Sequence, residues 1–290
     1  VLTNATAARV LTREKVAIGV EFLQAGGLAK AYASREVILS AGPQQSPKLL
    51  ELSGIGNEGI LSKHGIKVVH HLPGVGENLR DHTDVRLSFE CSKPITINDV
   101  MNSPWRKLKE GFKFIFRRRG LLTISSTTAR VVLRSDTTLR QPDLTLRLLP
   151  RSGKNRYARS PRYGGDTFSG FTIGVTVLQP RSIGTVHIGS DDPFQQAAMD
   201  PRYLSNEYDA ELVMRGLRIA RRLAQSSSLK RLIVRETRPG IDVQDEQGLL
   251  EHVKATTATS WHMVGTCKMG TDSMAVVDPE LRVYGMSNLR

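Results

Sequence analysis

The sequence predicts an α+β fold in which an antiparallel sheet dominates and segments of a different domain bracket it. Four segments between residues 84 and 190 alternate apolar and polar side chains, the pattern of half-buried antiparallel strands. Two segments, over 206–225 and 245–256, carry apolar residues at helical spacing. Before Asp81 the chain instead shows short helices and Pro/Gly-rich loops. The change near Asp81 therefore indicates a domain boundary.

The composition is that of an ordinary globular protein of two domains. The chain has 290 residues, of which 39% are hydrophobic and 24% charged. It holds no apolar run near the roughly 20 residues of a membrane helix. Cys91 and Cys267 cannot form a disulfide framework, and no Cys/His spacing indicates zinc, so we expect no metal site.

The first 65 residues predict a hairpin followed by two short helices. "VAIGVEFLQ" (16–24) is typical of a strand, with a Gly-Gly turn and a return strand over 31–42. Ser46 and Pro47 predict a helix that begins there as N-cap and first residue, and Gly54 ends it. "EGILSKHG" predicts a second helix that ends at Gly65, before a strand in "IKVVHHLPGVG".

The net charge of +13 is concentrated in two clusters, residues 106–120 and 151–165. In the first, five apolar residues recur at helical spacing between lysines and arginines: Trp105, Leu108, Phe112, Ile115 and Phe116. We expect a surface helix that packs its apolar stripe and leaves its basic face in solvent. A surface for a membrane or a partner is the alternative. Nucleic-acid binding is disfavoured, because the aromatic residues share one stripe instead of alternating as stacking platforms.

The stretch "LSGIGNEGIL" contains a literal G-x-G-x-x-G at Gly54, Gly56 and Gly59. A dinucleotide fingerprint follows a strand and opens a long helix, whereas these glycines follow a helix and precede two turns at most. We therefore expect a corner between two helices that needs glycine's positive φ, and no phosphate site.

Four ordered motifs resemble the glucose–methanol–choline (GMC) oxidoreductases, which are FAD-dependent. They are "SAGPQQSPKLLELSGIG" (40–56), "LPGVGENLRDH" (72–82), "LQPRSIGTVHIGSDDP" (178–193) and "WHMVGTCKMG" (261–270) with the "VVDPELRVYGMSNLR" that follows. The resemblance covers nearly the whole chain, and insect glucose-dehydrogenase-like members look most similar. It implies a partial Rossmann-like FAD-binding domain over 1–80 and a substrate-binding domain over 81–240. Residues 241–290 then return to the FAD-binding domain.

The resemblance also implies the site. His262 matches the family's catalytic histidine, and a neutral imidazole suits removal of an alcohol proton at physiological pH. Ala41 and Gly42 match an A-G that approaches FAD. Val10 matches a strand valine whose backbone meets the adenine, and Trp261 is expected near the flavin. Gly265 and Thr266 would keep the turn after the histidine tight.

Two departures and two absences qualify the resemblance. Met263 stands where many members have proline, and residues 120–136 are less glycine-rich than usual. Both ends look cut. The ADP-binding fingerprint would precede Val1, and a second active-site His or Asn would follow Arg290.

The function that follows is oxidation of a CH–OH group of an alcohol or sugar, with oxygen or a quinone as electron acceptor. The alternative is a non-catalytic binding or structural protein of the same fold. We expect no nucleic-acid partner and, by resemblance to insect members, an extracellular location.

Overall fold

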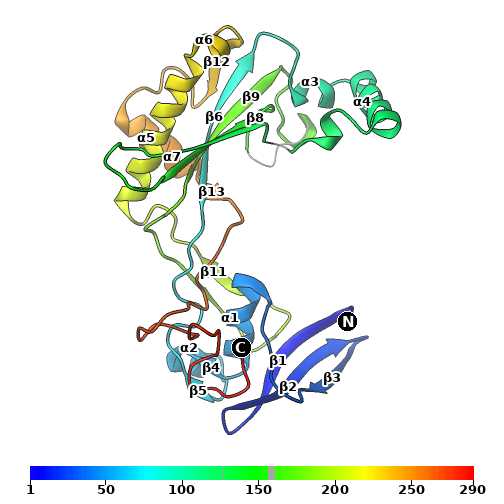
Figure 1. Cartoon of the computed structure of the whole chain (residues 1–290), viewed down its shortest axis with the longest axis vertical. Helices are drawn as coiled ribbons and strands as arrows, with labels where there is room; N and C mark the ends of the chain where they lie inside the picture. Colours follow the sequence, from blue (N-terminus) through cyan, green and yellow to red (C-terminus); the bar gives the residue numbers. More distant parts are fainter. Residues whose placement is uncertain (126, 156–160) are drawn as a thin grey trace. The chain divides into compact units, whose positions relative to one another are not determined.

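The computed structural model describes residues 1–125, 127–155 and 161–290, which divide into two compact units (Figure 1). Unit 1 comprises Val1–Asp81, Ser182–Tyr203 and Trp261–Arg290, and unit 2 comprises His82–Arg181 and Leu204–Ser260. The α+β prediction with a dominant antiparallel sheet is confirmed. Residues 182–203, expected in the substrate-binding domain, belong to unit 1. Residues 241–260, expected to return to the FAD-binding domain, belong to unit 2.

Unit 1 contains a three-stranded antiparallel sheet and two small pairs of strands. The sheet runs β1 (Ala5–Arg13), β2 (Val16–Gln24) and β3 (Gly27–Tyr32) in sequence order. The pairs are β4 (Ile55–Gly56) with β5 (His70–His71), and β10 (Thr185–His187) with β11 (Ala198–Asp200). The expected position of the return strand, 31–42, was wrong: the strand paired with β2 is β3, which ends at Tyr32. After Tyr32 the chain leaves β2 and pairs at Val37 with Leu289 near the C-terminus.

The first helix of unit 1, α1 (Gly42–Leu52), begins earlier than the sequence predicts. The prediction of Pro47 at the helix start was wrong, because Pro43 occupies the first turn and Pro47 lies inside the helix. A proline at this position cannot donate to the carbonyl of Pro43. Thr266 satisfies that carbonyl instead, since its hydroxyl donates to it at 2.7 Å.

The corner after α1 agrees with the expectation for the glycine motif. Gly54 has φ +79°, and an added Cβ would lie 2.4 Å from the carbonyl oxygen of Lys67. Helix α2 (Glu58–Lys63) then begins at Asn57, whose side chain accepts from the backbone N–H of Gly59. The close approach and the positive φ both require glycine at position 54.

Unit 2 is built on an antiparallel sheet of order β12-β6-β9-β8-β7, with β13 also paired to β6. Its strands are β6 (Thr83–Cys91), β7 (Ala129–Leu133), β8 (Leu144–Leu149), β9 (Gly170–Val177), β12 (Ile233–Arg238) and β13 (Ala258–Thr259). One face is apolar and packs on α5 (Glu207–Ala224) and α7 (Glu246–Thr256), both of which lie on the same side of the sheet (Figure 1). The other face carries polar side chains, as the alternation predicts.

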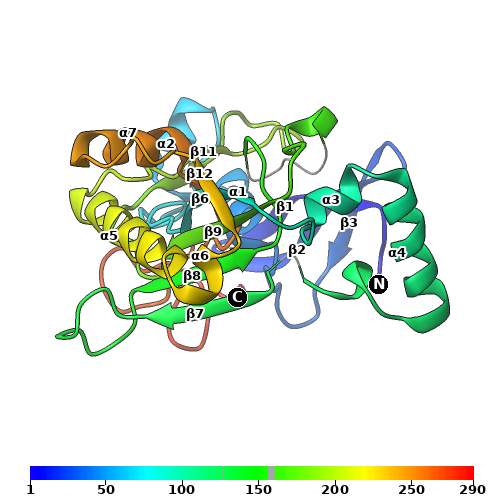
Figure 2. The same cartoon turned by 90° about the horizontal axis from the view of Figure 1, so that it is seen from above.

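The remaining elements of unit 2 are α3 (Ile97–Met101), α4 (Pro104–Arg117), α6 (Ser227–Lys230) and the 3-10 turns η1 (Leu121–Thr123) and η2 (Pro161–Tyr163). The helix predicted at residues 104–117 is present, but the expectation that its apolar stripe packs against the protein was wrong. No residue of α4 is buried. In both views α4 lies on the opposite side of unit 2 from α5 (Figures 1 and 2). Within the described ranges, no helix has the length and apolar character that crossing a membrane requires.

A buried ion pair fixes β10 to α1 in unit 1. Glu51 is fully buried and accepts from His187 Nδ1 at 2.7 Å and from the backbone N–H of Ile188 at 2.8 Å. His187 Nε2 reaches Glu77 at 3.2 Å. Burial lowers the pKa of His187, but the hydrogen bonds and charges of Glu51 and Glu77 outweigh it and raise the pKa above its usual value.

We expect His187→Gln to lower the free energy of unfolding by about 1–3 kcal/mol at pH 6, because it weakens a buried charged hydrogen bond. Because the pKa of His187 is higher in the folded state, protonation of His187 stabilises that state. This stabilisation is complete below the pKa of the unfolded state, about 6.5, and is lost as pH rises through the pKa of the folded state. Denaturant unfolding at several pH values should therefore show a smaller fall in stability with rising pH in the variant. The exposed His71→Gln is the control, and an unchanged pH dependence in His187→Gln would contradict the assignment.

Candidate active site

The candidate site of unit 1 is a loop, residues 261–267, that a buried aspartate holds in place. Asp81 accepts from the backbone N–H of His262 at 3.0 Å and from the hydroxyl of Tyr203 at 2.6 Å. The same loop pairs with the segment before Asp81, because Arg80 and Val264 exchange backbone hydrogen bonds of 2.9 Å. His262 itself is exposed, so a fixed backbone presents an accessible imidazole.

The loop needs unusual backbone angles on both sides of His262. Trp261 has φ +64°, which a bulky residue rarely adopts, and its side chain is 61% exposed. Gly265 has φ +95°, and an added Cβ would lie 2.3 Å from the carbonyl oxygen of Asn78. Backbone strain of this kind is concentrated at functional sites and persists only where the surroundings impose it. Here the residue after Trp261 is held by its N–H hydrogen bond to Asp81.

The N-terminus of α1 lies against this loop. Thr266 donates to the Pro43 carbonyl, and the side-chain amide of Gln44 donates to the sulfur of Met263 at 3.7 Å. Within the described residues, no side chain caps α1 at Ala41, and Gly42 has φ +80° with open space where a Cβ would be. Ala41 donates its N–H to the hydroxyl of Ser46 at 3.2 Å, and Pro43 has no N–H. The N–H of Gly42 is therefore the first one at the helix start that can receive a negative group, which the helix dipole favours there.

Val10 lies at the other end of α1. Its backbone N–H donates at 2.8 Å to the hydroxyl of Ser53, the residue that ends the helix. A residue in a strand directs its N–H and C=O to the same side, so Val10 turns both away from β2. That side of β1 lines a cleft of about 590 Å³, whose walls include Val10, Ser53, Gly54 and Lys67.

The structure thus brings four of the five predicted site residues to one end of α1 and places the fifth at the opposite end. Ala41, Gly42, Trp261 and His262 lie near the helix start, and Val10 lies near its end. A helix of 11 residues is about 16 Å long. Sequence reasoning did not identify Asp81 or Tyr203, although the "RDH" that contains Asp81 lies in a recognised motif.

The other histidines and Cys267 have structural surroundings. His82 and His252 each contact a backbone carbonyl, at 2.9 and 3.1 Å. Burial, with the charge of Glu51, raises the pKa of Cys267 to about 12, so the thiol stays protonated.

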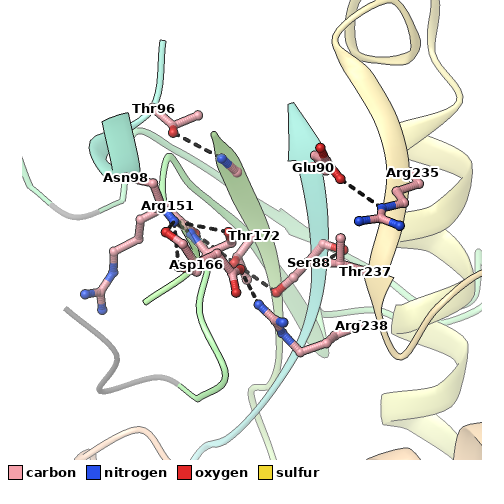
Figure 3. Close-up of polar contacts among 12 residues, drawn as sticks. Ser88, Glu90, Thr96, Asn98, Arg151, Asp166, Thr172, Arg235, Thr237 and Arg238 are labelled. Atoms are coloured by element: carbon pink, nitrogen blue, oxygen red, sulfur yellow. Dashed lines mark hydrogen bonds and ion pairs between the residues drawn. The ribbon is translucent and has the colours of Figure 1, made fainter. Parts of the chain in front are cut away.

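Unit 2 has a separate cleft of about 260 Å³ on the polar face of its sheet. Figure 3 shows the hydrogen bonds around it: Arg238 pairs with Asp166, and Thr172 donates to the Arg151 carbonyl at 2.8 Å. The buried Nε of Arg238 has no acceptor among the described residues. The arrangement supplies hydrogen-bond donors for a polar group.

Comparison with known proteins identifies the family. The N-terminal part of the GMC oxidoreductase profile matches residues 1–84, and the C-terminal part matches residues 180–290. The chain belongs to the GMC oxidoreductase family.

Among curated relatives, an oxygen-dependent choline dehydrogenase from Cronobacter sakazakii is 36% identical, over 100% of this chain and 51% of its own length. An alcohol dehydrogenase [acceptor] from Pseudomonas putida is 34% identical, over 100% of this chain and 52% of its own length. The chain thus spans about half the length of the relatives it matches.

Solved structures of the family share the fold. Formate oxidase from Aspergillus oryzae has a TM-score of 0.89 at 26% identity and covers 99% of this chain, which covers 54% of that enzyme. Pyridoxine 4-oxidase from Mesorbium loti has a TM-score of 0.82 at 24% identity, with coverage of 98% and 51%. The second likeness bears on the fold alone.

We expect Gly265→Ala to destabilise the protein more than Gly26→Ala. Both glycines have positive φ, which costs an alanine about 1–2 kcal/mol. Only at Gly265 would the new Cβ also clash with backbone, which adds about 1–3 kcal/mol. Denaturant unfolding of the two variants separates the effects. An equal loss of unfolding free energy in both variants would show that the Asn78 backbone shifts to make room for the Cβ, so that it does not hold the loop at Gly265.

Proposed function

We propose that the protein containing this chain is an FAD-dependent oxidoreductase that oxidises a CH–OH group of an alcohol or sugar, with His262 as the base. The observation that supports this most is the Asp81-anchored loop, which presents His262 beside the uncapped start of α1 in a chain of the GMC family. The relatives named for choline and alcohol oxidation support the substrate class.

The described residues fit FAD at two places. The backbone N–H of Gly42 at the start of α1 suits an electronegative edge of the cofactor, and the backbone of Val10 suits the edge of an adenine ring. Helix α1, with 11 residues and a length of about 16 Å, lies between the two places. Gly42 also leaves open space, so a planar ring can approach the backbone.

In the proposed mechanism FAD, when bound, supplies the two-electron acceptor for the hydride that leaves the alcohol carbon. His262 takes the hydroxyl proton, so the C–O bond becomes a C=O bond as the hydride departs. Asp81 fixes the backbone from which the imidazole extends. Trp261, the residue before it, has a positive φ and an exposed side chain.

We expect His262→Ala in the complete protein to slow flavin reduction by at least about 100-fold, the usual loss when a general base is removed. Anaerobic stopped-flow absorbance with a primary alcohol measures the rate, and the flavin content shows that the cofactor is retained. His71→Ala, an exposed histidine of the same unit, is the control. Reduction at the wild-type rate would remove His262 from this role.

We expect Asp81→Ala to lower the same rate by about 10-fold or more with little change in flavin content, because the His262 backbone loses its anchor. Tyr203→Phe is the matched variant, since it removes the hydroxyl that donates to Asp81 and keeps the His262 bond. A positioning role predicts that Asp81→Ala also shifts the pH profile of the rate, whereas Tyr203→Phe leaves it unchanged. Equal effects of both variants would show that Asp81 acts through overall stability alone.

A further inference from the structure

Helix α4 of unit 2 exposes a continuous apolar stripe to solvent. Its members are Trp105 (80% exposed), Leu108 (52%), Phe112 (52%), Ile115 (62%) and Phe116 (75%). At 3.6 residues per turn these five side chains span an arc of about 100°. Phe112 and Phe116 stack on each other, with ring centroids 5.8 Å apart, instead of packing into the core. A soluble monomer rarely leaves so contiguous a patch exposed without a function.

The helix is well formed although its apolar face is uncovered. Ser103 caps its start by accepting from the N–H of Arg106, and Pro104 occupies the first turn. On the side opposite the stripe, Glu110 pairs with Lys113 and accepts from the N–H of Leu121 in η1 at 3.1 Å. These bonds hold η1 against that side of α4. The side chains of the apolar stripe lie on the side that η1 leaves uncovered and are exposed.

Basic residues flank the stripe. Residues 104–119 contain seven cations and a single anion, and the cations are Arg106, Lys107, Lys109, Lys113, Arg117, Arg118 and Arg119. On a helical wheel Lys109, Lys113, Arg106 and Arg117 occupy the arc next to the stripe. Long basic side chains in this position can extend from an apolar surface to reach phosphate groups while their stems remain buried. Leu122 and Ile124, which follow the helix in the chain, are also exposed.

We propose that α4 docks this protein onto the surface of an anionic lipid bilayer, with the aromatic stripe inserted among the acyl chains and the cations on lipid phosphates. The net charge of +13 adds long-range attraction to the same surface. A helix of 14 residues is only about 21 Å long, so it lies along the interface and does not cross the bilayer. The proposal is independent of alcohol oxidation.

Charge disfavours a second copy of the chain as the occupant. A twofold interface brings a patch against itself, so the cations beside one stripe would face the cations beside the other. An anionic bilayer matches both features of α4 at once, because it offers hydrocarbon to the stripe and negative charge to its flank.

The test uses the complete protein and vesicles of phosphatidylcholine, alone or with about 30% phosphatidylglycerol, in a sedimentation assay at low and high salt. We expect binding to the anionic vesicles only, weakened at least about 10-fold by 0.5 M salt. Trp105→Gln with Phe116→Gln should weaken it at least about 10-fold, and Lys109→Glu with Arg117→Glu should do the same. Flavin content and circular dichroism should stay unchanged, because all four side chains are exposed or without a core contact.

Two control variants carry two substitutions each, as the test variants do. Val234→Gln with Ile241→Gln removes exposed apolar side chains elsewhere in unit 2, and Arg215→Glu with Arg218→Glu reverses exposed charges on α5. Both should bind vesicles within about twofold of wild type.

Three results would overturn the proposal. The first is wild-type protein that stays in the supernatant with anionic vesicles at low salt. The second is a dimer, by analytical ultracentrifugation, that Trp105→Gln with Phe116→Gln dissociates while vesicle binding is unaffected. The third is hydrogen-exchange protection of α4 in the complete monomer without lipid, which would show that the rest of the polypeptide covers the stripe.

Discussion

The carboxylate of Asp81 is the contact on which unit 1 depends. Unit 1 consists of three separate chain segments, and the chain leaves or re-enters it at Asp81, Ser182, Tyr203 and Trp261. Asp81 bonds to Tyr203 and to the backbone of His262, so one buried side chain joins three of these four points. Two residues earlier, Leu79 exchanges backbone hydrogen bonds of 2.9 Å with Gly184, which joins the fourth. The candidate base therefore lies where the segments of unit 1 are tied together.

A proline inside α1 extends this connection to the helix. Pro47 leaves the carbonyl of Pro43 without its helical partner, and an unpaired buried carbonyl costs free energy. The hydroxyl of Thr266, four residues after His262, supplies the missing hydrogen bond. The local defect in α1 thus creates the attachment point for the loop that carries His262. Without the defect, the helix would satisfy its own carbonyl and Thr266 would need another partner.

The sequence could predict what depends on local pattern and could not predict what depends on distant partners. Alternation predicted β6, β8 and β9 of unit 2 but not β7, β12 or β13. The helices expected over 206–225 and 245–256 are α5 and α7, because a helical period is a local property. The start of α1 was misplaced because Ser-Pro is a strong local signal, and only the distant Thr266 makes a proline tolerable inside the helix. The stripe on α4 shows the same limit, since periodicity defines an apolar face but not what covers it.

The two units fix the relative positions of their chain segments by different interactions. In unit 2 a continuous ladder joins β6, β9 and β8, and a shift of one residue would turn its whole apolar face away from α5. Unit 1 has no such ladder across its three segments, and apolar contacts alone are non-directional. Buried charged groups with fixed hydrogen-bond geometry supply the direction: Asp81 at the loop and Glu51 against His187. Each of these bonds joins residues more than 100 positions apart, so they specify how the segments of unit 1 meet.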